Sequence, residues 1–298
     1  MLIRTNVTNI GDPFVLNTGE NYYMYATSFD VEGFKVWKSD NLMEWECLGV
    51  CLDLRNSWAF QDFWAPEVIY YKGRYIMHYT ATRRTDQSLQ IGVAVSERPE
   101  GPFQDVHNGP MFDLGYGVLD GHVFEDEDGK AYFYYSKAGS DNYIEGKGKT
   151  AEVCVCELSD DRLSPKGEHI TLFGPSESYD SMKVGEQLWN EAPYVLKRDG
   201  IYYLTYSANF YQSKEYCICL AKAEHPCGPF IKHDNAILTY KDVEEDFSGP
   251  GHGAFFKDNE GNLRFSFHIH THADAPSGNR RACISNAKME KGTIVFAL

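Results

Sequence analysis

The sequence predicts an all-β fold: a five-bladed β-propeller with four-stranded antiparallel blades around a central channel. Three observations support this prediction. A hairpin-like segment recurs five times, Tyr and Phe are abundant (20 and 18 residues), and no long amphipathic helical run interrupts the pattern. Because no Pro/Ser-rich linker divides the chain, we expect one domain over residues 1–298. A β-sandwich or jelly roll with fortuitous internal similarity is the alternative.

Each of the five segments contains a polar residue, a short apolar strand, a turn with glycine, and a second strand rich in Tyr, Phe and Ile. The segments are 11–28, 65–81, 120–136, 190–207 and 251–268. Their turn glycines are Gly19, Gly73, Gly129, Gly200 and Gly261. Short polar turns of this kind need glycine where φ is positive, and they join antiparallel strands into hairpins.

A second strand–turn–strand element follows most of these hairpins. Examples are residues 37–46, 93–105 and 220–232, each with a Pro, Gly or Asn-containing turn. Two hairpins give four strands per unit, and radial repetition of four-stranded units is the architecture of a propeller.

Composition narrows the classes of partner. The formal net charge is −15, so a nucleic-acid backbone would be repelled, and a neutral ligand is favoured. No run of about 18 apolar residues predicts a membrane span. The first residues carry no apolar signal-peptide core, which predicts a cytoplasmic protein, or a periplasmic or secreted one if a leader was removed.

The eight cysteines are expected to be free thiols. Cys154 and Cys156, like Cys217 and Cys219, are separated by one residue within apolar alternating runs, so each pair shares one strand face. The CxxC spacing typical of zinc sites is absent. A disulfide or metal role is the alternative, and free thiols fit a reducing compartment.

The polar residues that open the five predicted inner strands carry the chemistry. They are Asp12, Glu67, Asp120, Glu191 and His252. Inner strands of a propeller line its channel, so all five side chains are expected to converge at one mouth. Singly, each carboxylate is as easily a turn, cap or surface residue. Together they form an acidic cluster, which raises at least one pKa and suits acid–base catalysis.

At these residues the sequence resembles the family-43 glycoside hydrolases, which are five-bladed propellers. The matching pieces, in order, are GDPF with Asp12, DFWAPEV with Trp64 and Glu67, LDGHVFEDEDGKAYFYY with Asp120, NEAPYVLKRDGIYYLTYS with Glu191, and GPGHGAFF with His252. Single pieces are weak signals, but five in the right order cover essentially the whole chain.

The resemblance implies an inverting mechanism. Asp12 would be the general base that activates a water, Glu191 the general acid that protonates the departing oxygen, and Asp120 the carboxylate that tunes and orients that acid. An inverting pair stands about 6.5–9.5 Å apart to admit the water. The implied products are L-arabinofuranose or D-xylose from plant cell-wall polysaccharides or oligosaccharides.

The resemblance also implies substrate-binding residues. Trp64 matches an aromatic wall of the terminal sugar pocket, with Phe29 as its partner; the alternative is that both rings belong to the blade core. Family members place a late arginine against a sugar hydroxyl. Arg280 and Arg281 both qualify, and Arg281 is preferred.

His252 matches a histidine on the channel axis that binds a water or a calcium ion in some members. Calcium prefers oxygen ligands, so no metal is required for the chemistry, although a structural calcium ion in the channel is compatible with the pattern. Glu67 is expected to have a supporting role at the substrate. The alternating residues His268, His270 and His272 are expected to line the channel or the core, with a metal site as the alternative.

The expected partner is therefore an oligosaccharide, with neither nucleic acid nor membrane, bound by a monomer or a weak homo-oligomer. The long stretch between Tyr135 and Glu191 is expected to form a rim that closes the far subsites and enforces exo action. Two alternatives stay open: a non-catalytic sugar-binding propeller, and a retaining sucrose- or fructan-cleaving relative on the same fold.

Overall fold

The computed structural model describes residues 1–243 and 246–298, and its regular structure is dominated by β-strands. Three sheets contain four antiparallel strands each. The first consists of β5 (Ala59–Tyr71), β6 (Arg74–Arg83), β7 (Leu89–Ser96) and β8 (Gln104–Asp105). The second consists of β9 (Val118–Glu125), β10 (Ala131–Lys137), β13 (Glu152–Leu158) and β14 (Pro165–Phe173). The third consists of β16 (Asn190–Arg198), β17 (Ile201–Ala208), β18 (Cys217–Ala223) and β19 (Ile231–Lys232).

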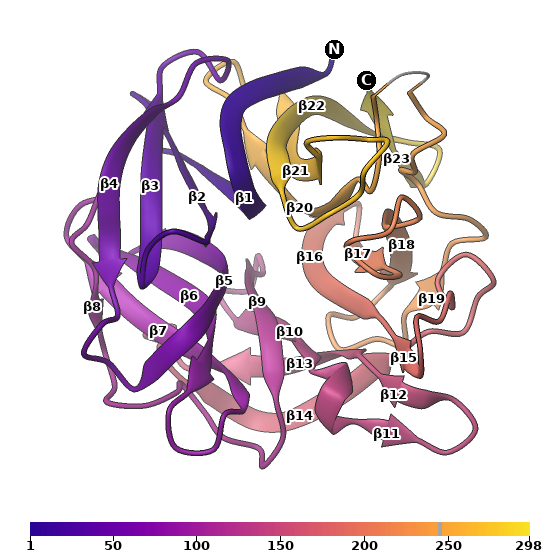
Figure 1. Ribbon diagram of the computed structural model, residues 1–298, viewed down its shortest axis with the longest axis horizontal. Coiled ribbons are helices and arrows are strands. Elements are labelled where there is room, and N and C mark those ends of the chain that lie inside the picture. Colours follow the sequence, from indigo (N-terminus) through magenta and orange to yellow (C-terminus); the bar gives the residue numbers. More distant parts are fainter. Residues whose placement is uncertain (244–245) are drawn as a thin grey trace.

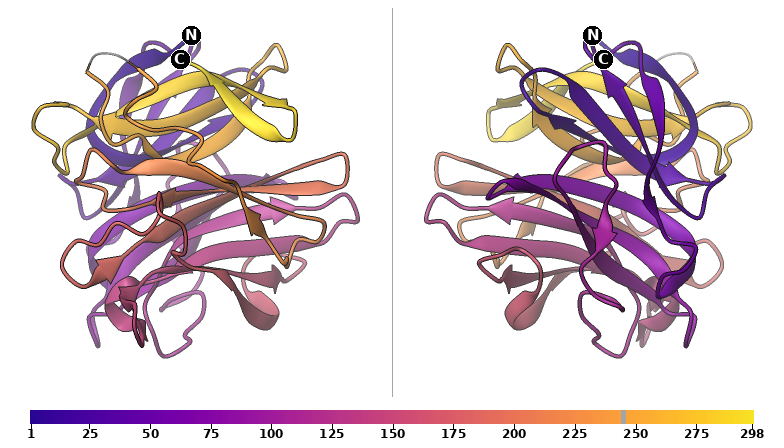
Figure 2. Two further views of the ribbon diagram at one scale, coloured as in Figure 1. Left: turned by 90° about the vertical axis from the view of Figure 1, so that its right-hand side faces the viewer. Right: turned by 90° about the vertical axis from the view of Figure 1, so that its left-hand side faces the viewer.

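An eight-stranded sheet joins the two ends of the chain. Its strands are β20 (Gly251–Lys257), β21 (Leu263–His270), β22 (Arg280–Glu290), β23 (Thr293–Ala297), β1 (Ile3–Asn17), β2 (Tyr22–Ser28), β3 (Gly33–Ser39) and β4 (Glu46–Asp53). The first part of β1 pairs with β22 and its last part with β2. The amino group of Met1 donates a hydrogen bond to the carbonyl of Ala297, and the two termini lie together (Figure 2).

A small three-stranded sheet lies beside these. It consists of β11 (Tyr143–Ile144), β12 (Gly148–Thr150) and β15 (Gln187–Leu188), and a 3-10 helix spans Gly139–Asp141. All three strands come from the stretch that the sequence assigned to a rim.

The larger sheets are arranged around a common centre, with β1, β5, β9, β16 and β20 nearest to it (Figure 1). The five predicted hairpins are confirmed as β1–β2, β5–β6, β9–β10, β16–β17 and β20–β21. All five turn glycines have positive φ, between 78° and 88°. The prediction of an all-β fold with four-stranded antiparallel sheets is therefore confirmed.

Apolar clusters fill the spaces between successive sheets. Tyr25 and Phe34 of the eight-stranded sheet pack with Met77 and Tyr79 of β6. Analogous clusters join β6 and β7 to β10 and β13, β10 and β13 to β17 and β18, and β18 to β21. A further cluster, which includes Met24 and Ile284, lies within the eight-stranded sheet where β2 and β22 flank β1. Burial of these aromatic and aliphatic faces holds the inner strands in place.

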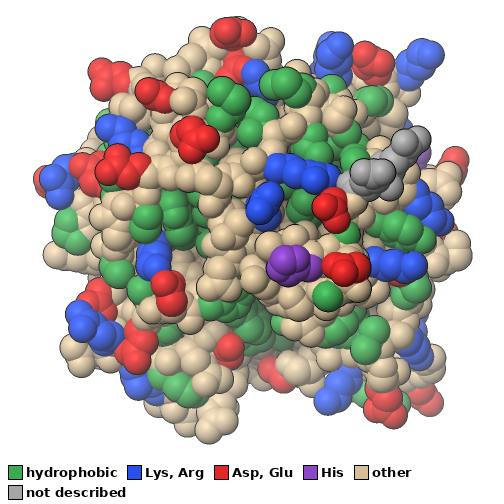
Figure 3. Space-filling view, turned by 45° about the horizontal axis from the view of Figure 1, so that its top comes forward, with side chains coloured by type: hydrophobic (Ala, Val, Ile, Leu, Met, Phe, Trp, Pro, Cys, Tyr) green, Lys and Arg blue, Asp and Glu red, His purple; other side chains and the backbone are tan. Residues whose placement is uncertain are grey.

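The cysteines are free, as predicted, and Cys154, Cys156, Cys217 and Cys219 are buried in these clusters. Among the described residues, no helix is long and apolar enough to cross a membrane. Acidic and basic side chains are interspersed over the face shown in Figure 3.

Candidate active site

The five inner strands share a local distortion that directs side chains to the centre. Each contains a residue in the left-handed region, followed by Pro or Gly, at a register shift with its hairpin partner. These residues are Asp12 (φ 55°), Ala65 (46°), Asp120 (58°), Ala192 (53°) and His252 (48°). A bulge of this kind re-aims the strand, and bulges recur next to active sites.

The structure corrects the predicted register of the carboxylates. Asp12, Asp120 and His252 do occupy one repeat position, but Glu191 lies one residue before it and Glu67 two residues after it. Across a bulge, neighbouring residues no longer alternate cleanly between faces, so all three positions can reach the channel at different depths. The position of Glu191 is that of Gly11, Trp64, Leu119 and Gly251 in the other inner strands.

The amide N–H of each left-handed residue donates to a side chain of the preceding hairpin around the centre. Ala65, Asp120 and His252 donate to the hydroxyls of Thr27, Thr80 and Ser207, with N···O distances of 2.9, 3.0 and 2.7 Å. Asp12 donates instead to Nδ1 of His268 at 3.1 Å.

One member of the repeat departs from this pattern. Ala192 donates to Oδ2 of Asp120 at 3.1 Å, whereas the hydroxyl of Ser136, which occupies the repeat position of the other acceptors, is buried without a partner among the residues that the structure describes. The carboxylate of Asp120 is therefore fixed against the backbone that carries Glu191.

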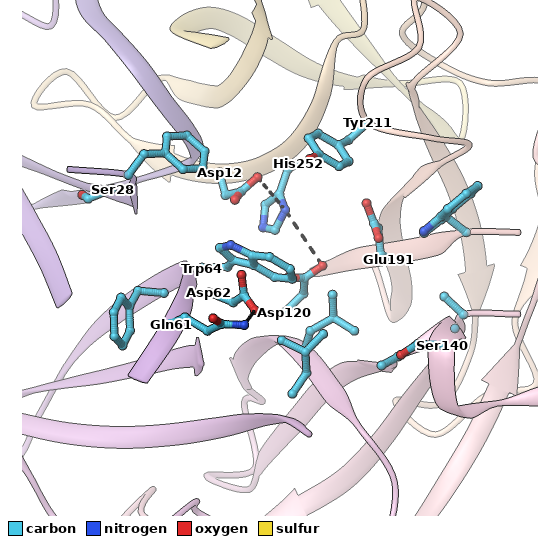
Figure 4. Close-up of a pocket in the computed structure, with 18 of the residues that line it drawn as sticks. Asp12, Ser28, Gln61, Asp62, Trp64, Asp120, Ser140, Glu191, Tyr211 and His252 are labelled. Atoms are coloured by element: carbon cyan, nitrogen blue, oxygen red, sulfur yellow. Dashed lines mark hydrogen bonds and ion pairs between the residues drawn. The ribbon is translucent and has the colours of Figure 1, made fainter. Parts of the chain in front are cut away.

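These side chains open into a pocket of 690 Å³ at the centre of the sheets. Figure 4 shows Asp12 and Glu191 on opposite sides of the pocket, with His252 and Asp120 between them. The lining also includes Ser28, Phe29, Phe60, Gln61, Asp62, Phe63, Trp64, Leu119, Ala138, Gly139, Ser140, Gln187, Trp189, Tyr211, Tyr216 and Arg280.

Asp12 is held in its ionised form. Its Oδ1 lies 3.1 Å from Nη1 of Arg280 and 3.2 Å from Nδ1 of His252, and its Oδ2 accepts a hydrogen bond from Thr27. Burial alone would raise the pKa of Asp12, but His252, Arg280 and Thr27 outweigh burial and hold that pKa below its usual value. Burial also lowers the pKa of His252, so Arg280 carries the permanent positive charge beside Asp12 at neutral pH.

Asp120 and Glu191 are held toward their protonated forms. Burial raises the pKa of Glu191 to about 7, the charge of Asp12 adds to this, and the hydrogen bond from Tyr216 and the charge of Arg280 oppose it. Burial, followed by the charges of Glu191 and Asp12, raises the pKa of Asp120 well above its usual value. The two buried carboxyls repel each other when both are ionised, so the pair retains a proton near neutral pH.

The predicted aromatic residues both line the pocket. Trp64 is partly buried at the bulge of β5, and the Phe29 side chain is 49% exposed beyond the end of β2. Because its ring is exposed, Phe29 does not belong to the blade core, and that alternative is wrong for this residue.

The prediction that Arg281, rather than Arg280, faces the sugar pocket is wrong. Arg280 lines the pocket and binds Asp12, whereas Arg281 is not a lining residue and its buried Nε has no hydrogen-bond partner in the described part of the chain. Successive residues of β22 point to opposite faces, so only one of the two can face the centre. Gly11 makes room for this arginine: a Cβ at Gly11 would lie 2.2 Å from Nη2 of Arg280.

The expected contact of Glu67 with substrate is also corrected. Glu67 lies outside the pocket lining and borders a smaller cavity deeper in the channel, together with Asp120 and His252. Its Oε2 lies 2.8 Å from Nδ1 of His122, because two residues beyond the bulge the strand has already descended into the channel. His252 lines both cavities.

The three histidines near the end of the chain lie in different environments. His268 and His270 are buried on β21, as expected for channel or core residues, whereas His272 is exposed beyond the end of that strand. His270 contacts the hydroxyl of Ser248 and the carbonyl of Tyr211. In the part of the chain that the structure describes, no group of three or more His, Cys, Asp or Glu residues could hold a metal ion.

Several lining residues were not anticipated from the sequence. Tyr216 donates a hydrogen bond from its hydroxyl to Oε1 of Glu191 at 2.8 Å, and Trp189 packs on Phe210 beside the small sheet. The ring of Tyr211 lies 5.0 Å from the guanidinium of Arg280. Two of these residues, Trp189 and Tyr211, flank the recognisable segment 190–207, but no local pattern distinguishes them from core aromatics.

Known proteins are similar to this chain in sequence, and a solved structure is similar to it in fold. The chain is 26% identical over 297 residues to the β-D-galactofuranosidase xynD of Aspergillus niger, which covers 92% of this chain and 77% of that protein. It is 29% identical over 230 residues to a xylosidase/arabinosidase of Bacteroides ovatus, which covers 71% and 68%. The crystal structure of a thermostable family-43 glycoside hydrolase superposes with a TM-score of 0.93 at 40% identity, over 99% of this chain and 95% of that one.

The family model for glycosyl hydrolases family 43 matches residues 6–294, which include every carboxylate of the pocket. With that match over nearly the whole chain, the protein belongs to family 43 of the glycosyl hydrolases.

Proposed function

We propose that the protein is an inverting, exo-acting glycosidase that releases L-arabinofuranose or D-xylose from plant cell-wall polysaccharides or oligosaccharides. One observation carries the proposal: a single pocket holds Asp12 ionised and Glu191 with a pKa raised to about 7. A general base and a general acid must coexist at the working pH, and these two environments separate the two roles.

In the proposed reaction, Asp12 removes a proton from a water whose oxygen attacks the anomeric carbon. The bond from that carbon to the glycosidic oxygen breaks, and Glu191 gives its proton to the departing oxygen. Asp12 ends protonated and Glu191 ionised, and exchange with solvent restores both. Attack opposite the leaving group inverts the anomeric centre.

Asp120 tunes and orients the acid. Its fixed position on the amide of Ala192 keeps a carboxylate beside Glu191, and repulsion between the two groups favours retention of a proton by the pair. It is not expected to contact the attacking water.

Aromatic and basic residues bind the sugar. The rings of Trp64 and Phe29 offer flat surfaces for the apolar faces of a furanose or pyranose. Arg280 both neutralises Asp12 and presents donors to sugar hydroxyls.

The rim supports exo action. Gly139 and Ser140 of the 3-10 helix, with Gln187 of β15, line the pocket, so the helix and the small three-stranded sheet form part of its wall. A chain end, rather than a chain interior, fits a pocket bounded by that wall.

We further propose that the fold is a single-domain five-bladed propeller. The eight-stranded sheet divides naturally at β1, whose first part completes the β20–β21–β22 unit and whose last part begins the β2–β3–β4 unit. Five left-handed bulges, five hairpins and five apolar clusters agree with five blades closed by the two ends of the chain.

The reaction needs no cofactor, and the expected partner is an oligosaccharide bound by a monomer or weak homo-oligomer. Dialysis against EDTA should leave kcat/KM unchanged. Loss of activity that calcium restores would instead require an ion in the channel.

Product stereochemistry and leaving-group dependence test the proposal. Proton NMR of the first product on an arabinofuranoside or xyloside should show inversion. Glu191→Gln should reduce turnover of oligosaccharides far more than turnover of activated aryl glycosides, because only poor leaving groups need protonation. Retention would favour the sucrose- or fructan-type alternative. No turnover of any aryl arabinofuranoside, xyloside or galactofuranoside, with binding unaffected by Asp12→Asn, would favour a sugar-binding propeller.

A further inference from the structure

We propose, building on the assignment of Glu191 as the general acid, that Tyr216 is a positioning residue for that acid: its hydroxyl fixes one carboxyl oxygen of Glu191 so that the other faces the substrate. Tyr216 precedes β18, outside the segments that carry the family resemblance, and it lines the pocket with an exposed fraction of 1%.

The contact between the two residues selects one oxygen. The Tyr216 hydroxyl donates to Oε1 of Glu191 at 2.8 Å. Within residues 1–243 and 246–298, Oε2 has no hydrogen-bond partner, although Glu191 is largely enclosed by the pocket. With Oε1 held, Oε2 is the oxygen available to carry the proton to a glycosidic oxygen.

The ring of Tyr216 is itself held from two sides. A Cβ on Gly251 would lie 1.9 Å from the ring, so the ring packs directly on the backbone of β20. Gly251 occupies the repeat position that bears Trp64, Leu119 and Glu191 in other inner strands, and only a glycine there admits the tyrosine.

The second contact links the acid to the base. The ring of His268 lies parallel to that of Tyr216, with 5.7 Å between centroids and 6° between planes. Nδ1 of His268 accepts the amide N–H of Asp12. Glu191 thus contacts one ring of the stacked pair through its carboxyl, and Asp12 contacts the other through its backbone amide, so the two rings connect the strands that carry the acid and the base.

Tyr216→Phe tests the hydroxyl while keeping the ring. A hydrogen bond to a carboxylate stabilises its charged form, so its removal should raise the pKa of Glu191 and move the basic limb of the kcat/KM profile to higher pH by about 0.5–1 unit. Turnover of oligosaccharides should fall about 10-fold, and turnover of an activated aryl glycoside less than about 2-fold, with KM little changed.

A matched control separates positioning from general stability. Tyr202→Phe removes another buried hydroxyl that donates to a carboxylate, that of Asp126, away from the pocket. It should lower the melting temperature without moving the basic limb.

If Tyr216→Phe leaves the limb in place and slows both substrates equally, the hydroxyl is only structural and the proposal is overturned. Should that variant fail to fold, Gly251→Ala displaces the same ring, and the same shift of the limb is expected. Glu191→Gln separates the failure of the positioning role from the failure of the acid role. Equal losses of turnover on oligosaccharides and aryl glycosides in Glu191→Gln would overturn the assignment of Glu191 as the acid. A basic limb that does not move in Tyr216→Phe would overturn only the positioning role of Tyr216.

Discussion

Gly11 makes room for Arg280, the cation that holds the proposed general base Asp12 in its ionised form. A Cβ at this position would lie 2.2 Å from Nη2 of Arg280, and an ordinary contact needs at least 3.4 Å. In Gly11→Ala the guanidinium must therefore retreat by about 1.2 Å or more. Gly11 lies outside the left-handed region, so alanine adds no backbone strain.

The retreat weakens the ion pair of Arg280 with Asp12. Lengthening their 3.1 Å contact by that amount costs about 1.5 kcal/mol at an effective dielectric constant of about 20. This corresponds to a rise of about one unit in the pKa of Asp12. A general base must be ionised, so the acidic limb of kcat/KM should move up by about one pH unit.

The assay is the pH dependence of kcat/KM on the aryl glycoside that the enzyme turns over. At the optimum we expect a loss of about 10-fold, since Arg280 also leaves its place against the sugar. Gly109→Ala is the matched control, because a Cβ there would have no heavy atom of the other described residues within 4 Å, its two chain neighbours aside. An unmoved acidic limb with activity within about 2-fold of the parent would refute the coupling of Gly11 to Asp12 through Arg280.

Two further predictions concern charge. In Asp120→Asn the pair can no longer retain a proton through like-charge repulsion, so the basic limb of kcat/KM should move down toward the pKa of about 7 that burial and the charge of Asp12 give Glu191; a pH–rate profile checks this. Lys232→Met removes the positive charge that pairs with the fully buried carboxylate of Asp180. The free energy of unfolding, measured by urea denaturation, should fall by about 3–5 kcal/mol. Lys35→Met, at an exposed ion pair, should cost less than about 1 kcal/mol, and equal costs would contradict the role of burial.

The sequence by itself determined the repeat. Five glycine turns between alternating strands are local features, so the hairpins and the convergence of Asp12, Asp120 and Glu191 at the centre could be read from it. The family resemblance then supplied the roles of base, modulator and acid, which remain predictions for the experiments above.

Only the tertiary structure decided which neighbours complete the pocket. The bulges change the face that residues of the inner strands present, so strand alternation could not place Glu67 in the deeper channel. Alternation on β22 puts Arg280 and Arg281 on opposite faces, but only the closure of the sheets decides which face meets the pocket. The contacts of Asp12 with Arg280, and of Glu191 with Tyr216, join different strands and loops across the fold. Such contacts depend on how the sheets close around the centre, and no local pattern encodes them.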